Sequence, residues 1–484
     1  VMQLSCAQED AFTTPSLISR LTSDTYNVHQ MVDRMQRLGV RAPILLVGGI
    51  ALTLSLEPVL TLVLIATLPL LGLVVWFVST RGIRLYTRTQ LALDALVRRA
   101  QESMAGIRVI HALSKGDYER ARFDEANARA VNCDQRAGFL MNVTNPAMNL
   151  LLNTGLTVVI VLGAYRVNAG LAQPGSIIAF LSYFTIILNA MMMVSRLFMI
   201  YSKGAASAKR IEEILETPLE PVPGEAAPRT SQYHVEFRHV NFSYNKAKNK
   251  TRDDLSDVSF ALRRGQTLGI IGPTGSGKST LINLIPRFYD CTSGSVELFG
   301  HAVQQYGFAQ LRQMIGIVPQ RAVLFTGTIR DNMQWACPDA TDEQIWQALE
   351  IAQAADFVRG KPKGLDEPVE TAGRNFSGGQ RQRLTIARAL VPHPQVLILD
   401  DSSSALDFAT DAALRKALKE QTHGMTVFIV SQRASAVQRA DRILVLDDGN
   451  LVGSGTHANL LKTCDVYREI CLSQLSREEV EKTL

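Results

Sequence analysis

The stretch Thr267-Leu-Gly-Ile-Ile-Gly-Pro-Thr-Gly-Ser-Gly-Lys-Ser-Thr280 decides how the rest of this 484-residue chain is interpreted. Its apolar beginning predicts a buried strand, and the apolar run Leu281 to Ile285 predicts a helix after it. Between them, residues 272–279 match the phosphate-binding pattern G-x-x-x-x-G-K-[ST] in full. Glycines let successive backbone N–H groups surround phosphates, Lys278 reaches the outer phosphates, and the Ser279 hydroxyl suits Mg²⁺. The sequence therefore predicts binding of ATP and Mg²⁺.

Two further runs lie downstream of this loop. The strand Val396-Leu-Ile-Leu-Asp400 ends in a carboxylate that is placed to hold the Mg²⁺ shell through water. The run Phe376-Ser-Gly-Gly-Gln380 precedes that strand. With these runs in this order, the chain resembles the ATP-binding cassette (ABC) family.

The resemblance implies roles for further residues. Tyr244 resembles the aromatic residue that stacks on adenine, and Gln320 resembles the Q-loop glutamine that senses Mg²⁺ and the membrane domain. The Mg²⁺ ligands would be Ser279, Gln320 and Asp400. The residues that contact ATP and its metal would be Tyr244, Gly272, Pro273, Thr274, Gly275, Ser276, Gly277, Lys278, Ser279, Thr280, Gln320 and Asp400.

Two catalytic positions depart from the family pattern. Members with full ATPase activity usually place Glu where this chain has Asp401, and His where it has Gln432. Asp ends one methylene short, and a misplacement of about 1 Å can cost roughly 10²-fold in rate. Gln432 can donate a hydrogen bond to phosphate but cannot become cationic. We expect binding to survive while hydrolysis suffers, unless the change is harmless drift and Asp401 still serves as a weaker base.

This paired change resembles the degenerate subunit of heterodimeric ABC exporters. In such dimers each ATP lies between the P-loop of one chain and the signature of the other. The partner would be a second ABC half-transporter chain with intact catalytic Glu and His. This chain would supply the signature residues Ser377, Gly378, Gly379 and Gln380, with Asp407 of the D-loop run Ser404-Ala-Leu-Asp407, to its partner's site. Two alternatives stay open, a homodimeric exporter with slow hydrolysis and a non-transport ABC ATPase.

The first 200 residues contain four apolar stretches. They run roughly over residues 42–56, 59–79, 139–165 and 177–200. A membrane span needs about 20 residues to cross about 30 Å of hydrocarbon, so the first is short unless its ends extend. The intervening segment from Arg81 to Gly138 is rich in arginine, as are the flanks of the first and last stretches, and the positive-inside rule makes all of them cytoplasmic.

The segment between the second and third stretches has helical periodicity that breaks at Gly106. Long helices should therefore project below the membrane, and the residues from Gly106 to Phe123 resemble a coupling region of the exporter branch. The opening segment Ser16 to Asp24 resembles the family's first intracellular loop. Because a complete half-transporter has six spans, we interpret the chain as N-terminally truncated, with a four-span variant as the alternative.

The predicted fold class is an α-helical transmembrane domain of the ABC exporter type, with four of six spans, followed by an α/β P-loop ATPase domain with an α-helical subdomain. Residues 1–215 form the partial transmembrane domain with long intracellular helices. A Pro-rich linker covers residues 216–232, and the ABC ATPase domain covers residues 233–484. Asp448-Gly449 predicts a hairpin turn.

The composition limits the kinds of metal site and binding partner that the sequence predicts. The six cysteines form no C-x-x-C pair and the eight histidines show no metal spacing, so no disulfide framework or zinc site is predicted. The net charge of +5 is not concentrated in a basic patch with interleaved aromatic residues, so nucleic acid is not expected. We expect a multi-pass protein of the cytoplasmic membrane, with the lipid bilayer around it, its ATPase domain in the cytoplasm, and a small hydrophobic or amphipathic substrate such as a drug or lipid.

Overall fold

The computed structural model describes residues 1–219, 231–244, 253–402, 405–422 and 424–475. Within the helices, it gives the backbone alone for Val75, Val78, Ser79, Gly82, Ile83, Arg84, Tyr86, Met141, Thr144, Asn145, Ser195, Arg196, Phe198 and Met199. The chain divides into two compact units, one formed by Pro15–Thr217 and the other by Val1–Thr14 with Pro218–Leu484. The segment predicted as the linker lies mostly outside the described residues.

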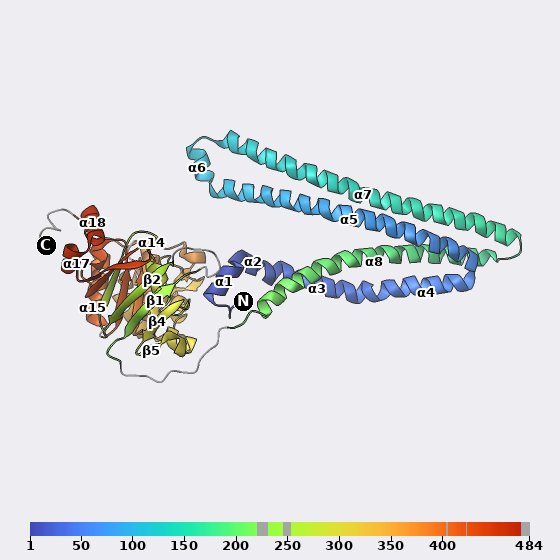
Figure 1. The fold of residues 1–484 in the computed structure, drawn as a ribbon. Coiled ribbons are helices and arrows are strands. Elements are labelled where there is room, and N and C mark those ends of the chain that lie inside the picture. Colours follow the sequence, from blue (N-terminus) through green and yellow to red (C-terminus); the bar gives the residue numbers. More distant parts are fainter. Residues whose placement is uncertain (220–230, 245–252, 403–404, 423, 476–484) are drawn as a thin grey trace. The chain divides into compact units, whose positions relative to one another are not determined.

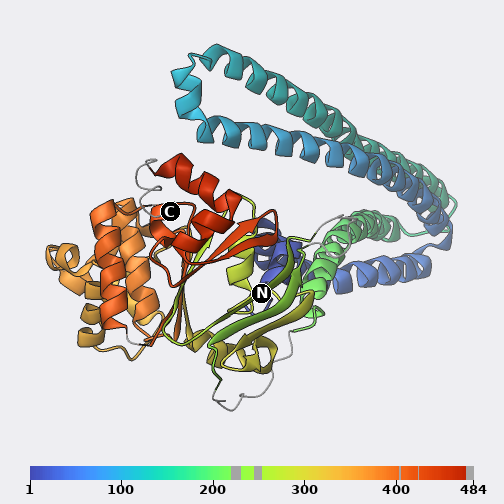
Figure 2. The same cartoon turned by 60° about the vertical axis from the view of Figure 1, so that its left-hand side comes forward.

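The unit Pro15–Thr217 is built from long helices. After α2 (Thr14–Ser19) and a π-helical turn, Arg20–Asp24, the chain continues through α3 (Thr25–Arg34), a second π-helical turn, Met35–Gly39, and α4 (Val40–Leu56). The remaining helices are α5 (Pro58–Ala105), α6 (Ile107–Ala112), α7 (Gly116–Asn168) and α8 (Pro174–Leu215). Helix α5 lies beside α7, and α4 lies beside α8 (Figure 1 and Figure 2). The break predicted at Gly106 is observed, because this residue caps α5.

Close helix contacts hold this unit together. Leu60, Phe180, Phe184 and Ile187 are fully buried in its apolar core. Two glycines allow the helices to approach, since an added Cβ would lie 2.7 Å from the Phe184 ring at Gly155 and 2.5 Å from Met31 at Gly204. Small residues at helix crossings are typical of membrane helix packing, where close van der Waals contact replaces the hydrophobic effect.

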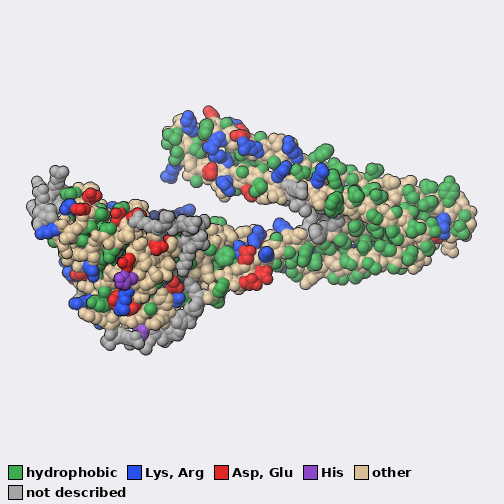
Figure 3. All heavy atoms as spheres, viewed as in Figure 1, with side chains coloured by type: hydrophobic (Ala, Val, Ile, Leu, Met, Phe, Trp, Pro, Cys, Tyr) green, Lys and Arg blue, Asp and Glu red, His purple; other side chains and the backbone are tan. Residues whose placement is uncertain are grey.

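Three helical segments among the described residues are long and apolar enough to cross a membrane: Thr14–Leu56, Pro146–Asn168 and Pro174–Val194. They overlap the first, third and fourth predicted stretches. The second overlaps Pro58–Val74, a shorter apolar helix, so the count of four spans stays a prediction. Hydrophobic side chains cover the part of this unit away from α6, and lysine and arginine gather near α6 (Figure 3). This separation of apolar and basic surfaces matches the charge asymmetry expected for a membrane domain.

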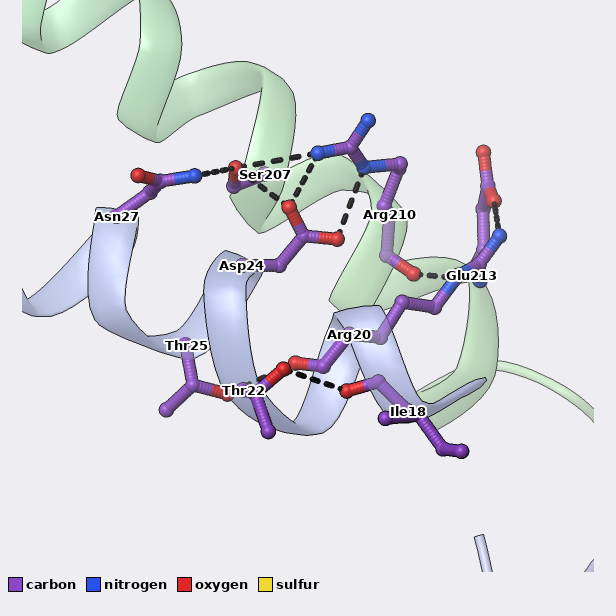
Figure 4. A network of polar contacts seen from close by, with 9 residues as sticks. All are labelled: Ile18, Arg20, Thr22, Asp24, Thr25, Asn27, Ser207, Arg210 and Glu213. Carbon is purple, nitrogen blue, oxygen red and sulfur yellow. Dashed lines mark hydrogen bonds and ion pairs between the residues drawn. The ribbon is translucent and has the colours of Figure 1, made fainter. Parts of the chain in front are cut away.

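A polar network joins the start of this unit to the end of α8 (Figure 4). The Asp24 side chain is buried and accepts hydrogen bonds from Ser207 Oγ at 2.8 Å and Arg210 Nε at 3.0 Å, and it also contacts Arg210 Nη2. Arg20 donates to the Arg210 carbonyl at 2.7 Å and to Glu213 at 3.1 Å. The buried carboxylate is therefore compensated by a cation and a hydroxyl from the same unit.

The other unit contains a mixed sheet in the order β5-β4-β1-β2-β12-β11-β3-β10-β9-β6. Strands β3, β6, β9, β10 and β11 pair in parallel, and successive residues of each are buried on opposite faces. Such double burial explains their nearly continuous apolar sequence. The strands are β1 (Val235–Phe242), β2 (Leu255–Leu262), β3 (Thr267–Ile271), β4 (Ser293–Leu298), β5 (His301–Ala302), β6 (Ile315–Val318), β9 (Val396–Asp400), β10 (Thr426–Val430), β11 (Arg442–Asp447) and β12 (Asn450–Gly455).

A helical insert separates β6 from β9, as expected from the sequence between Gln320 and Asp400. It contains α11 (Ile329–Gln334), α12 (Asp342–Ile351), α13 (Ala355–Arg359) and α14 (Gly378–Leu390), with a small sheet of β7 (Gly327–Thr328) and β8 (Pro368–Val369). The remaining helices of the unit are α1 (Cys6–Phe12), α9 (Lys278–Asn283), α10 (Phe308–Gln313), α15 (Phe408–Gln421), α16 (Ala434–Val437), α17 (His457–Thr463) and α18 (Asp465–Gln474). The predicted hairpin turn at Asp448-Gly449 joins β11 to β12.

Candidate nucleotide-binding site

A cavity of about 560 Å³ opens at the carboxyl ends of β3, β9 and β10. These strands are neighbours, because β10 pairs with both β3 and β9. In open parallel sheets, ligands bind outside the carboxyl ends of the strands. The residues that line the cavity are Asp253, Asp254, Thr274, Gly275, Gly277, Lys278, Ser279, Thr280, Gln320, Asp400, Asp401, Val430, Ser431, Gln432, Asp448 and Gly449.

The loop between β3 and α9 forms one wall of this cavity. Gly275 and Gly277 have φ values of +84° and +92°, which L side chains rarely adopt, so glycine is required for the turn. The Lys278 ammonium donates to the carbonyls of Gly272 at 2.9 Å and Pro273 at 2.6 Å. Burial lowers the pKa of Lys278. The loop thus holds a desolvated cation at the cavity wall, where it suits phosphate.

The pair Ser279 and Asp400 lies beside the lysine. The Ser279 hydroxyl lies 3.0 Å from one Asp400 carboxylate oxygen and 3.3 Å from the other. Burial raises the pKa of Asp400, and the neighbouring Asp401 raises it further, while Ser279 and Lys278 lower it. The two carboxyls therefore carry more negative charge than the neighbouring groups compensate. Mg²⁺ would find hydroxyl, carboxylate and amide oxygens here, from Ser279, Asp400 and Gln320.

No group of three or more His, Cys, Asp or Glu side chains among the described residues could hold a metal ion. A Mg²⁺ ion at this site would therefore need ligands beyond the protein. Mg²⁺ is commonly bound by one or two carboxylates together with substrate phosphates and water. These donor atoms therefore suit a metal ion that binds together with a nucleotide.

The two departures from the expected catalytic pattern line the same cavity. Asp401 follows β9 with φ +43°, and its N–H donates to the Val430 carbonyl at 2.9 Å. Burial raises the pKa of Asp401, whereas Arg433 and a hydrogen bond with Gln320 lower it. The Gln432 side chain is exposed, and its backbone carbonyl accepts a hydrogen bond from Gln474 at 2.8 Å. A carboxyl and an amide therefore belong to the lining of the cavity that also contains the phosphate loop.

Tyr244 lies at the border of the cavity. Its side chain is 45% exposed, and its hydroxyl lies 3.4 Å from the hydroxyl of Thr280, which does line the cavity. Its N–H donates to the carboxylate of Asp254 at 3.0 Å. The position fits a platform for a planar base.

Sequence reasoning missed six lining residues: Asp253, Asp254, Val430, Ser431, Asp448 and Gly449. Asp448-Gly449 had been interpreted only as a turn. The turn reaches the phosphate loop because β11 pairs with β3, and the Gly449 N–H donates to the Ser276 carbonyl at 3.3 Å. No local motif reports this contact.

Two family models match the chain: "ABC transporter transmembrane region" over residues 1–191 and "ABC transporter" over residues 255–404. The uncharacterized ABC transporter ATP-binding protein YfiB of Bacillus subtilis is 38% identical over 471 residues, which are 97% of this chain and 81% of that protein. The chain belongs to the ABC transporter family.

Other relatives place this ABC transporter among exporters. The probable multidrug resistance ABC transporter YheI of Bacillus subtilis is 36% identical, over 85% of this chain and 70% of that protein. The ATP-dependent lipid A-core flippase of Chromohalobacter salexigens is 32% identical, over 98% of this chain and 81% of that protein. A solved bacterial Atm1-family ABC exporter matches with a TM-score of 0.82 and 25% identity, over 98% of this chain and 83% of that one.

These findings make the chain an ATPase-coupled ABC exporter half-transporter, with a membrane-embedded helical region and a cytoplasmic ATPase domain. Members of this kind work as dimers. The predicted non-transport ABC ATPase is therefore not supported, since the chain matches the transmembrane region of exporters.

The signature residues Ser377, Gly378, Gly379 and Gln380 do not line the cavity. Ser377 caps α14, its hydroxyl accepting from the Gln380 N–H at 3.3 Å while its own N–H donates to the Gln380 side chain at 3.0 Å. The start of α14 is exposed. Asp407 caps α15 by accepting from the Thr410 N–H at 2.9 Å, and Ser404 lies outside the described residues.

Proposed function

We propose that this chain is the half of a heterodimeric ABC exporter whose own P-loop-side ATP site is degenerate. One observation carries the proposal: Asp401 and Gln432 line the same cavity as Lys278, Ser279 and Asp400. The two departures therefore lie where they would affect hydrolysis rather than elsewhere on the surface. ATP-driven export itself rests on the family.

The proposed site binds ATP with Mg²⁺. Lys278 and the loop residues Gly272–Thr280 would hold the phosphates, Tyr244 would stack on the adenine, and Ser279, Gln320 and Asp400 would hold the metal. Mg²⁺ would supply charge neutralisation on the phosphate oxygens. The protein's own contribution is to orient the phosphates and to keep the base on its platform.

Asp401 is placed to attract a water proton, but its carboxyl ends one methylene earlier than Glu. A shift of about 1 Å in a reacting group can cost roughly 10²-fold in rate. Gln432 can still donate a hydrogen bond, but it has no titratable proton to transfer. Binding is thus preserved and turnover at this site is slow.

The signature supports a role in the partner's site. Ser377–Gln380 form an exposed helix start with a complete capping box, which is away from the chain's own cavity. The N-terminus of a helix suits phosphate from a second chain. The proposed partner is a second half-transporter with intact catalytic Glu and His, which carries most of the turnover.

The substrate we propose is hydrophobic or amphipathic, a drug or a lipid, moved across the cytoplasmic membrane. Two relatives are named for multidrug resistance and for flipping of lipid A-core. The helical unit buries large apolar side chains in its core. As domain limits we propose 1–215 for the transmembrane part, 216–232 for the linker and 233–484 for the ATPase domain.

The test is ATP turnover of the full chain in nanodiscs, alone and with its partner half-transporter. Comparison is made with Asp401→Glu plus Gln432→His, and with Asp401→Asn, which keeps the side-chain size but removes the carboxylate. We expect low turnover alone, high turnover with the partner, and little further gain from the double change. Asp401→Asn should then change the heterodimer rate less than two-fold.

The second candidate is a homodimeric exporter with slow hydrolysis. Burial of Asp401 raises its pKa, which suits a carboxylate that acts as a base nearer neutral pH. Brisk turnover of the chain alone that Asp401→Asn abolishes would establish this homodimer and overturn the degenerate-site proposal.

A further inference from the structure

Three aromatic rings meet beside the nucleotide cavity. Tyr289 approaches Tyr244 edge-to-face, with ring centroids 5.0 Å apart and planes at 86°. Phe242 meets Tyr244 in the same manner at 4.8 Å and 86°, and it meets Tyr289 at 5.8 Å. Because Tyr244 is 45% exposed, these two rings rather than burial fix its orientation.

The hydroxyl of Tyr289 donates a hydrogen bond to the carboxylate of Asp10 at 2.7 Å. Burial raises the pKa of Tyr289, and the bond to Asp10 raises it further, so the phenol remains a donor across the physiological range. Asp10 lies on α1, a helix whose start is closed by a capping box between Ser5 and Gln8.

Helix α1 is assigned to one part of the protein by its contacts and to another by the family match. It belongs to the compact unit that contains the ATPase sheet, yet it falls within the residues that match the transmembrane region of ABC transporters. The Gln8 side chain also donates to the Pro218 carbonyl at 2.8 Å, within the same unit. Directly after α1, Thr13 has φ +63°, and the chain then enters the long helices through α2.

We propose that Tyr289 is a positioning residue that braces the adenine platform Tyr244 and links it to α1 through Asp10. This inference rests on the proposed role of Tyr244 as the base-stacking residue. A bound base that restricts the Tyr244 ring also restricts Tyr289, and the hydrogen bond to Asp10 transmits that restriction to α1. The first helix of the chain thereby responds to the base and not only to the phosphates.

The first test measures affinity by calorimetry on the full chain in nanodiscs, without Mg²⁺ to prevent turnover. An edge-to-face pair contributes enough free energy to change a dissociation constant roughly two- to ten-fold. We expect Tyr289→Ala to weaken ATP binding by that factor and to leave inorganic tripolyphosphate binding within two-fold of wild type. Equal loss for both ligands, or no loss for ATP, would overturn the bracing role.

The second test measures hydrogen exchange of residues 5–13 with and without ATP. In wild type, ATP should slow exchange in α1, and tripolyphosphate should do so less. Asp10→Ala should abolish the ATP-dependent change, and Tyr289→Phe should do the same, because each removes one partner of the same bond. Persistence of the full ATP response in both variants would overturn the link to α1.

Tyr306→Phe is the matched control. It also removes a tyrosine hydroxyl from this unit, one that donates to the Leu298 carbonyl at 2.6 Å, and the Tyr306 ring makes its aromatic contact with His301. This variant should keep both the selective affinity for ATP and the response of α1. Similar losses in Tyr306→Phe and Tyr289→Phe would indicate general loosening of the unit and would overturn the proposal.

Tyr244→Ala separates this inference from the proposed function. If Tyr244→Ala weakens ATP but not tripolyphosphate, the base platform stands and the Tyr289 variants test the brace alone. If Tyr244→Ala has no selective effect, the proposed platform is wrong and the brace fails with it.

Discussion

The two units hold acidic side chains in different electrostatic settings. Asp24 of the helical unit accepts hydrogen bonds from Ser207 and from two nitrogens of Arg210 (Figure 4). Asp400 of the ATPase unit has a raised pKa, because partial burial and the neighbouring carboxyl of Asp401 raise it more than Ser279 and Lys278 lower it. A carboxylate whose charge is neutralised by groups of the same chain contributes to the folded structure. A carboxylate in a site with excess negative charge suits the binding of a cation from solution.

The largest effect should follow from removing the charge at the nucleotide cavity. Asp400→Asn keeps the shape but loses a Mg²⁺ ligand, so the gain in ATP affinity on adding Mg²⁺ should fall about 10- to 100-fold. Calorimetry with Mg²⁺ and with chelator measures that gain. Asp447→Asn is the control, because Asp447 ends β11 as Asp400 ends β9 but does not line the cavity. Equal behaviour of the two variants would contradict the metal assignment.

The same isosteric change at Asp24 should destabilise the folded protein. Breaking a fully buried ion pair costs about 3–5 kcal/mol, but the Arg210 side chain is 52% exposed and can be rehydrated, so we expect about 1–3 kcal/mol. Thermal unfolding of the protein in nanodiscs measures the loss for Asp24→Asn.

Asp33→Asn provides the comparison on the adjoining helix. Asp33 pairs with Arg37 at 2.6 Å, and the Arg37 side chain is 74% exposed. We expect a cost below about 0.5 kcal/mol, as for exposed helical pairs. A similar loss in both variants would show that burial of Asp24 has no special weight.

A smaller effect of opposite sign should appear when Asp400→Asn is studied without nucleotide. Removing a partly buried charge whose pKa is raised by desolvation relieves an unfavourable term, so stability should increase by about 0.5–2 kcal/mol. Asp24→Asn should decrease stability under the same conditions. The comparison between the two regions breaks down if both variants shift the melting temperature in the same direction.

The smallest effect concerns pH. The folded chain binds protons at Asp400 and Asp401 more tightly than the unfolded chain, whose carboxyls titrate near 3.8. Their contribution to stability therefore decreases as the pH rises from 3.8 through the raised folded values. Mg²⁺ affinity should rise over the same interval, because the proton competes with the metal. Melting curves of wild type should show this slope, and those of Asp400→Asn should show less of it.

Local motifs predicted the nucleotide cavity well. Lys278, Ser279, Gln320, Asp400, Asp401 and Gln432 all line one cavity, although they come from four separate segments. They meet there because each motif fixes a strand end or a loop, and parallel strands bring their carboxyl ends to one edge. Asp254 and Asp448 were missed, because only the pairing of β11 with β3 brings the Asp448-Gly449 turn beside the phosphate loop.

Long-range polar contacts were beyond sequence reasoning. Asp24 and Arg210 lie 186 residues apart, and Asp10 and Tyr289 lie 279 residues apart. Each of these residues alone looks like an ordinary solvated side chain. The first apolar stretch was likewise predicted to be short, whereas the structure continues it upstream as one helical segment, Thr14–Leu56. Helix α8 packs along that segment, and Ser207 of α8 donates a hydrogen bond to Asp24 of the segment.

The sequence by itself determined the phosphate loop, the apolar helices and the two substituted catalytic positions, because backbone conformation, hydrophobic periodicity and side-chain chemistry are local properties. Only the tertiary structure decided which charges are compensated. Packing brings Arg210 to Asp24 from 186 residues away, and it brings Ser279 and Lys278 to Asp400. The carboxyl beside Asp400 is its sequence neighbour Asp401, so only the compensating groups depend on the fold.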